Sequence, residues 1–285
     1  MEEWFLFALS GSFLHSISTV IDKYILDREF DIVLTAILKM LFNGSLLLIV
    51  ALSLLHLDVT LNTLFGASVL GVIYGVSGVI YYKSLKSGDV GEVAPYVQSG
   101  TMLLIFVFSL MLFGEYADIP NYLGVVLASL GIYILLSKKG FLPPILNKGV
   151  LFMSAAIVLN TIHSLLSKWF LFDAEPMDLI ILMYLSAAFT ITLYNISSRR
   201  STHKIFSYGF AGASRVLVSS VFASAGTFFI YLALSIGEAS RVYTTVGSLS
   251  IFVFLIAVVF LKEKFYLHRL AGIISAVLGI YLIYI

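Results

Sequence analysis

The chain has 285 residues, of which 60% are hydrophobic and only 12% are charged, and its formal net charge is +1. A soluble domain of this size carries about twice that charged fraction, so this composition excludes a protein that exposes most of its surface to water. The near-neutral charge and the lack of a basic run predict no nucleic-acid partner, and the absence of cysteine excludes disulfides, thiolate metal sites and a cysteine nucleophile.

Apolar runs of about 17–25 residues, the length that crosses a bilayer as a helix, follow one another along the chain. We predict ten spans, at residues 4–26, 32–55, 64–84, 92–113, 119–137, 149–172, 178–197, 213–236, 240–261 and 266–285. The runs are continuously apolar and do not alternate, which excludes a transmembrane β-barrel. We therefore expect an all-α, multi-pass protein of the cell membrane, surrounded by the lipid bilayer.

The two halves of the chain resemble each other. A glutamate, two spaced glycines and the tetrapeptide Leu-Gly-Ile-Tyr occur twice, with Glu115, Gly124 and Gly131 and again with Glu263, Gly272 and Gly279. Residues 81–93 also resemble 230–242, and residues 21–26 resemble 166–171. These matches indicate a duplication that covers nearly the whole chain.

The duplication predicts two five-helix repeats, at residues 1–140 and 147–285, which together form one transport domain. Because each repeat has an odd number of spans, the two copies enter the membrane from opposite sides. The result is a pair of inverted repeats, an architecture typical of secondary transporters, in which the substrate binds near the midplane where the repeats meet.

Several of these features also form a family pattern. They are Gly-Glu at 114–115, Lys-Glu at 262–263, the glycine-spaced last span of each half, and Pro95 in the fourth span. With these features the sequence resembles the EamA-type members of the drug/metabolite transporter superfamily. The second half departs from the pattern, because Thr244 and Thr245 stand where a proline is common. The resemblance implies a permease or exporter for a small molecule, with amino acids, drugs and other metabolites as the family's substrates.

Polar side chains within the predicted spans are candidates for a binding site, since they are costly in hydrocarbon unless they face partners or water. Alignment of Lys23 with Lys168 places His15 opposite Asn160 and Ser18 opposite His163. The candidate substrate-binding residues are His15, Tyr74, Ser77, Tyr96, Gln98, Asn160, His163, Ser224, Thr227, Tyr231 and Tyr243. Histidine titrates near neutral pH and so suits proton coupling. Helix packing is the alternative role for the histidines and for the hydroxyl stripe of span 213–236, which consists of Ser220, Ser224, Thr227 and Tyr231.

The remaining polar groups predict a mostly neutral site. Spans 32–55 and 178–197 offer little besides Lys39 and Asn43, and no carboxylate is placed near the middle of a span. Lys39 is either a cationic ligand or a side chain that extends to the interface, and Lys168 is interpreted as such an interfacial anchor. A neutral lining suits a small polar or amphipathic molecule, zwitterions included, better than a multiply charged phosphate.

Other functions compete with this transport hypothesis. Residues 75–78 read Gly-Val-Ser-Gly, the pattern of an intramembrane serine protease, for which His163 could act as the base. A flippase for a lipid-linked metabolite is a further alternative. We expect no enzyme activity, no cofactor and no metal site. The small-residue faces of spans 119–137 and 266–285 predict close helix packing or a homodimer contact.

Basic residues in the connections predict the orientation. One side of the membrane collects Arg28, Lys86, Lys138, Lys139, Lys148, Arg199, Arg200, Lys204, Lys262, Lys264 and Arg269, whereas the other side has little beyond Arg241. The positive-inside rule then places both termini outside the cytoplasm.

Overall fold

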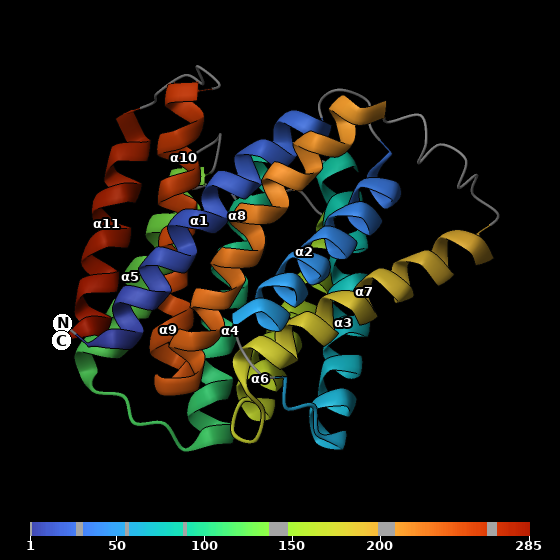
Figure 1. The fold of residues 1–285 in the computed structure, drawn as a ribbon. Coiled ribbons are helices and arrows are strands. Elements are labelled where there is room, and N and C mark those ends of the chain that lie inside the picture. Colours follow the sequence, from blue (N-terminus) through green and yellow to red (C-terminus); the bar gives the residue numbers. More distant parts are fainter. Residues whose placement is uncertain are drawn as a thin grey trace.

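The computed structural model describes residues 2–26, 31–54, 57–87, 90–136, 148–198, 209–260 and 267–285; within these ranges, the side chains of residues 81–96 and of several residues at helix ends are not described. Every regular element in the described ranges is an α-helix, which confirms the predicted class. The helices are α1 (Glu3–Leu26), α2 (Ile32–Leu54), α3 (Leu61–Ser87), α4 (Val90–Phe113), α5 (Ile119–Leu136), α6 (Lys148–Phe170), α7 (Pro176–Ser197), α8 (Gly209–Ile236), α9 (Ala239–Val246), α10 (Ser248–Phe260) and α11 (Leu267–Tyr284) (Figure 1).

The helices match the predicted spans closely, with one exception. The predicted span 240–261 is divided at Gly247 into α9 and α10, because only this residue between them leaves the helical pattern. Among the described residues, seven segments are long and apolar enough to cross a membrane, and α9 with α10 counts as one of them. Parts of α4, α5 and α11 form three shorter apolar helices, so the count of ten spans stays a prediction.

Local signals begin and end these helices. The Asp31 carboxylate accepts hydrogen bonds from the backbone nitrogens of Val33 (2.9 Å) and Leu34 (3.0 Å), which caps the start of α2. The Thr60 hydroxyl caps α3 in the same way, at 3.1 Å from the nitrogen of residue 63. After α4 the chain turns at Gly114, whose φ of +64° lies in the left-handed region that glycine adopts without strain.

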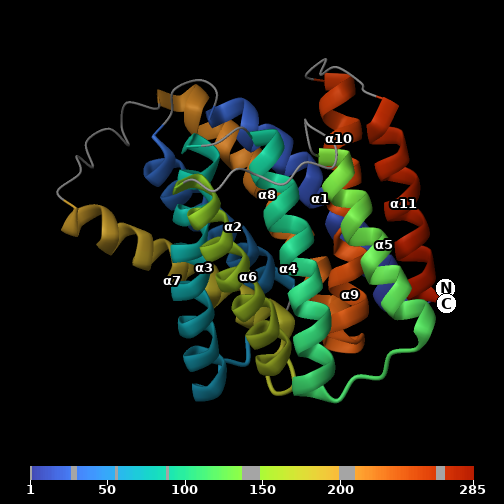
Figure 2. The same cartoon turned by 180° about the vertical axis from the view of Figure 1, so that it is seen from behind.

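Helices from the two halves pack against each other throughout the bundle. Helix α1 contacts α8, α3 contacts α6, α2 contacts α7, α4 contacts α9, and α5 contacts α11 (Figures 1 and 2). If each helix is replaced by its counterpart in the other half, the α1–α8 contact becomes the α6–α3 contact. The α2–α7, α4–α9 and α5–α11 contacts each join two counterparts, so the exchange leaves them unchanged. This set of contacts has the two-fold pattern of a duplicated protein.

Small residues bring α5 and α11 together in opposite directions. Gly124 lies against the Gly279 carbonyl, and Gly131 lies against the Gly272 carbonyl and the Ala276 backbone. The predicted close packing is therefore made within one chain, which leaves these glycine faces covered. The homodimer stays a prediction and would need another surface.

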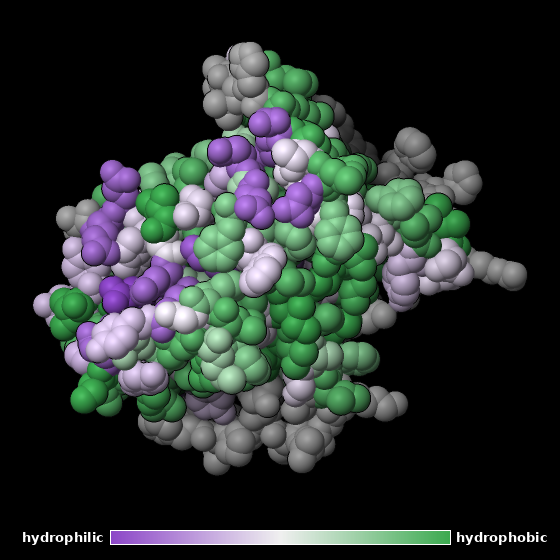
Figure 3. Space-filling model, turned by 90° about the horizontal axis from the view of Figure 1, so that it is seen from below, coloured by the Kyte–Doolittle hydropathy of each residue, from purple (hydrophilic) through white to green (hydrophobic). Residues whose placement is uncertain are grey.

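Both termini lie on the same face of the bundle (Figures 1 and 2). Figure 3 views the molecule from this side and shows hydrophilic side chains gathered among hydrophobic ones. Among the basic residues that predict the orientation, only the Arg269 and Arg241 side chains belong to the described part; the others lie outside it, as does Glu263.

Candidate functional site

Two hydrogen bonds meet at the Thr227 hydroxyl in the middle of the bundle, and one of them joins the two halves. His15 Nε2 on α1 lies 2.8 Å from the Thr227 hydroxyl on α8. The same hydroxyl lies 2.6 Å from the Tyr184 hydroxyl on α7. Tyr184 is fully buried and Thr227 is buried, whereas His15 keeps part of its surface accessible. The predicted candidates His15 and Thr227 are thus direct partners.

A second hydrogen bond lies at the position that corresponds to the His15–Thr227 bond when the two halves are exchanged. Ser77 on α3 donates its hydroxyl proton to the Asn160 side-chain oxygen on α6. Asn160 aligns with His15, and Ser77 is next to Gly78, which aligns with Thr227 through the resemblance of residues 81–93 to 230–242. Each of the two pairs therefore joins one residue from each half, at equivalent places in the fold.

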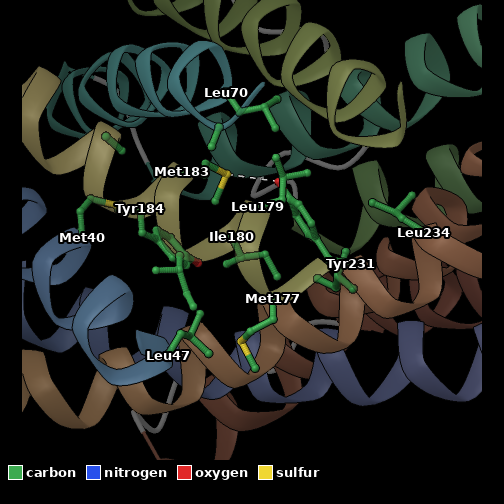
Figure 4. Close-up of a cluster of buried hydrophobic side chains, with 14 of the residues drawn as sticks. Met40, Leu47, Leu70, Met177, Leu179, Ile180, Met183, Tyr184, Tyr231 and Leu234 are labelled. Atoms are coloured by element: carbon green, nitrogen blue, oxygen red, sulfur yellow. Dashed lines mark hydrogen bonds between the residues drawn. The ribbon is translucent and has the colours of Figure 1, made fainter. Parts of the chain in front are cut away.

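The Met183 sulfur of α7 connects further candidates. His163 Nε2 lies 3.3 Å from this sulfur, and the Tyr231 hydroxyl donates to it at 3.2 Å, as the dashed line in Figure 4 shows. The Tyr231 hydroxyl is also 2.9 Å from the Ser167 hydroxyl. Residues of α6, α7 and α8 thus meet at one buried point.

Tyr74 of α3 completes the central cluster. This cluster consists of His15, Tyr74, Ser77, Asn160, His163, Met183, Tyr184, Thr227 and Tyr231. The ring centre of Tyr74 lies 5.1 Å from that of His163 and 5.9 Å from that of Tyr184 in an edge-to-face contact. Tyr74 and His163 are only partly buried. A β-carbon added to nearby Gly78 would meet no heavy atom of the described residues within 4 Å, so the described side chains leave space beside this stretch of α3.

The other candidates are less closely connected. The buried Ser224 hydroxyl donates to the Ser220 carbonyl of its own helix at 2.7 Å, so this bond lies within α8. Gln98 on α4 and Tyr243 on α9 are partly buried, and these two helices contact each other. The side chain of Tyr96 lies outside the described part of the structure.

The geometry gives the protease hypothesis no support. Ser77 is hydrogen-bonded to Asn160, and His163 contacts Met183. His163 is therefore not placed as a base for Ser77 in this arrangement.

Comparison with known proteins identifies the family. The EamA-like transporter family matches residues 3–137 and, separately, residues 147–285. The chain belongs to the EamA-like transporter family. The predicted resemblance is thus confirmed, and the chain is a multi-pass membrane protein of this family.

A curated relative and a solved structure also resemble the chain. An uncharacterized transporter in the cobO 3′ region of Sinorhizobium sp. is 31% identical over 65 residues, which are 23% of this chain and 45% of that protein. The match thus spans less than half the length of that relative. A solved structure, described as a crystal structure of a protein, covers 98% of this chain and 95% of its own with a TM-score of 0.79. At 15% identity it shows a shared fold.

Two charged residues of this EamA-like transporter bind helix ends on the terminus side of the bundle. The Glu115 carboxylate accepts hydrogen bonds from the backbone nitrogens of Ala239 (2.6 Å) and Ser240 (2.9 Å), and so caps α9. The Lys168 ammonium donates to the carbonyls of Leu234 (2.7 Å) and Gly237 (2.9 Å) at the end of α8. The interpretation of Lys168 as an interfacial anchor was wrong, because these carbonyls bind its charge inside the protein.

The sequence prediction missed two parts of the transporter's polar interior. Tyr184 lies in a span expected to offer little, although its hydroxyl, like that of Ser186, is near the middle of α7. Asp22 pairs with Lys39, so a carboxylate lies inside the bundle, toward the end of α1 and not near the middle of the span. The signal for this pair was the lysine itself, since an ammonium within a span requires a partner.

Proposed function

We propose that this EamA-like protein is a secondary-active transporter that moves a small polar or amphipathic metabolite by alternating access. Residues 1–140 and 147–285 form two inverted five-helix repeats around a site near the midplane. The opposite directions of α5 and α11 support this arrangement, because corresponding helices of inverted repeats run antiparallel. Both termini lie outside the cytoplasm.

One observation carries the proposal. The equivalent pairs His15–Thr227 and Ser77–Asn160 occur where the two halves meet, and Tyr184 hydrogen-bonds to the first pair. Polar groups in a membrane interior are costly, and partly accessible ones beside open space are suited to a cargo. A site shared by both repeats can face either side of the membrane as the repeats exchange conformations.

The chemistry of these residues favours a small cargo without multiple charges. Imidazole, amide, hydroxyl and tyrosine groups dominate the centre, which provides donors, acceptors and aromatic surfaces. A multiply charged phosphate would require convergent arginines or lysines, and the central cluster contains neither. The proposed cargo is therefore neutral or zwitterionic, in the size range of an amino acid.

A counterflow assay tests this function. Purified protein is reconstituted into liposomes loaded with a mixture of unlabelled metabolites, and uptake of each labelled metabolite is measured against protein-free liposomes. Tyr184→Phe keeps the ring but removes the hydroxyl that contacts Thr227, so we expect slower uptake. Tyr281→Phe makes the same change at an exposed position of α11 and serves as the control. Uptake that never exceeds that of protein-free liposomes would refute the proposal.

A further inference from the structure

A charged pair lies inside the bundle between α1 and α2. The Lys39 ammonium contacts the Asp22 carboxylate and donates a hydrogen bond of 2.9 Å to the Ser18 hydroxyl. The Ser219 hydroxyl of α8 donates to the other Asp22 oxygen at 2.6 Å. Each charge thus has an opposite charge and a hydroxyl as partners, at a point where three helices meet.

The second half packs the equivalent position without charges. Lys39 is the eighth residue of α2, and Met183 is the eighth residue of α7. The contact of Lys39 with Ser18 corresponds to the contact of Met183 with His163, because Ser18 and His163 align. Neutral side chains are therefore sufficient to pack two helices at this place in the fold.

Packing alone does not account for the ion pair. Asp22 aligns with Ser167 of α6, so both charges have neutral counterparts in the second half. Buried ion pairs add little net stability compared with well-packed apolar residues, and ionisable groups within membrane helices mark binding or transport sites. The side chains of Asp22 and Lys39 are 15% and 9% exposed, so the pair is not completely covered.

The pair is continuous with the proposed cargo site. His15, Ser18 and Asp22 follow one another at spacings of three and four residues, which places them on one face of α1. His15 belongs to the central cluster, and Asp22 lies about two helical turns further along the helix. A cargo held at the centre can therefore extend a charged end toward the pair.

We infer that Asp22 and Lys39 form a subsite for the charged end of a zwitterion, with the cargo ammonium bound by Asp22 and the cargo carboxylate by Lys39. The inference rests on the proposed function and adds the substrate class. The ion pair between Asp22 and Lys39 opens as the zwitterion enters. Asp22 then pairs with the cargo ammonium in place of Lys39, and Lys39 pairs with the cargo carboxylate in place of Asp22. A cargo with a single charge leaves one protein charge unpaired, which is costly in a low-dielectric site. In an α-amino acid one carbon separates the two charged groups, so they can bind adjacent partners.

Matched probes test the subsite on the full chain, by thermal shift in detergent and by counterflow in reconstituted liposomes. Thermal shift and counterflow are measured with L-phenylalanine, L-leucine and L-serine. Each is compared with its amine analogue (phenethylamine, isoamylamine, ethanolamine) and with its carboxylate analogue (hydrocinnamate, isocaproate, hydracrylate). At least one zwitterion should raise the Tm and be transported, and its two analogues should bind about tenfold more weakly or worse, because each lacks one charge-assisted contact.

Substitutions should alter this preference in opposite directions. Lys39→Met leaves Asp22 unpaired, so the amine analogue gains relative to the zwitterion; Asp22→Asn leaves Lys39 unpaired, so the carboxylate analogue gains. The double variant Asp22→Ser with Lys39→Met reproduces the residues of the second half, and it should fold but lose the zwitterion preference. Arg241→Gln, which breaks the 2.8 Å pair with Glu238, is the control and should keep the preference.

The outcomes separate this inference from the transport proposal. Wild-type affinity for a zwitterion in the double variant overturns the subsite and assigns the ion pair to structure. Transport of other metabolites, combined with no binding of any of the three zwitterions, also overturns the subsite but leaves the transport function in place. Failure of the wild type to transport any metabolite refutes the transport function itself.

Discussion

Gly131 of α5 and Ala276 of α11 lie so close that a β-carbon added to the glycine would come within 2.3 Å of the Ala276 backbone nitrogen. Gly279 has the same relationship to the backbone of Ala128, also at 2.3 Å. These contacts involve backbone atoms, which a rotamer change cannot move. The last helices of the two halves are therefore held together at the shortest separation that their small residues permit.

Gly131→Val should destabilise the protein more than an ordinary surface substitution. The added side chain forces α5 and α11 apart, and overpacking of this kind costs about 1–3 kcal/mol or more. We expect a lower Tm and a loss of the monodisperse peak in size-exclusion chromatography. Val277→Ala, at an exposed position of α11, is the control. An unchanged Tm for Gly131→Val would mean that the helices separate without penalty.

Glu115→Gln should lower stability through the cap of α9. Both carboxylate oxygens accept backbone hydrogen bonds at the start of that helix, and the neutral amide has only one acceptor oxygen. The expected loss is about 1 kcal/mol, measured as a lower Tm in detergent. Glu175 precedes α7 without a side-chain cap, so Glu175→Gln is a matched control. Equal effects of the two substitutions would contradict a specific role for Glu115.

Most of the fold follows from the sequence because the bilayer restricts what a span can be. A crossing helix needs about 20 apolar residues, so the apolar runs mark the helices without knowledge of their packing. The division at Gly247 was missed because residues 239–260 are together apolar enough to be interpreted as one span. That glycine packs against Met102 and Ile132 of other helices, and such tertiary contacts leave no local pattern in the sequence.

The site could be predicted only where the duplication points to it. Alignment of the halves placed His15 opposite Asn160, and both turned out to bind a partner on a helix of the other half. The alignment did not mark Met183 as a site residue, because a methionine within an apolar run is interpreted as part of the hydrophobic core. Its sulfur accepts a hydrogen bond from Tyr231 only because α7 and α8 meet there. Partners across helices depend on packing, which the sequence pattern does not specify.

The double variant His15→Gln, His163→Gln should impair transport while preserving the fold. Glutamine retains hydrogen-bonding groups but not the shape of the imidazole, so contacts with a cargo change more than contacts with Thr227 and Met183. We expect uptake to fall about tenfold and stability to change by about 1 kcal/mol. Ser129→Ala in α5 is the control. Normal uptake at normal expression would assign both histidines to helix packing.

Reporter fusions should place the C-terminus outside the cytoplasm. A reporter after Ile285 and another after Gly140 lie on opposite sides of the membrane if the predicted spans are correct. The basic connections favour the cytoplasm, so the reporter after Gly140 should be cytoplasmic and the one after Ile285 should not. The reverse result would show that the loop charges do not determine the orientation. The same location for both would contradict the span count.

Gly78→Leu should block transport without unfolding the protein, in contrast to Gly131→Val. Both positions are glycines within membrane helices, but open space adjoins Gly78, whereas Gly131 has backbone within 2.3 Å. The β-carbon of a leucine at position 78 meets no described heavy atom within 4 Å, so the side chain extends into the space beside Ser77 and Tyr74. If the space belongs to the cargo path, uptake falls while the Tm stays near the wild-type value. Gly78→Ala adds only a single methyl group and should retain most of the uptake. The loss of uptake in Gly78→Leu would then depend on the volume of the side chain. Full uptake in Gly78→Leu would place the cargo path elsewhere in the bundle and leave the central hydrogen bonds with a structural role.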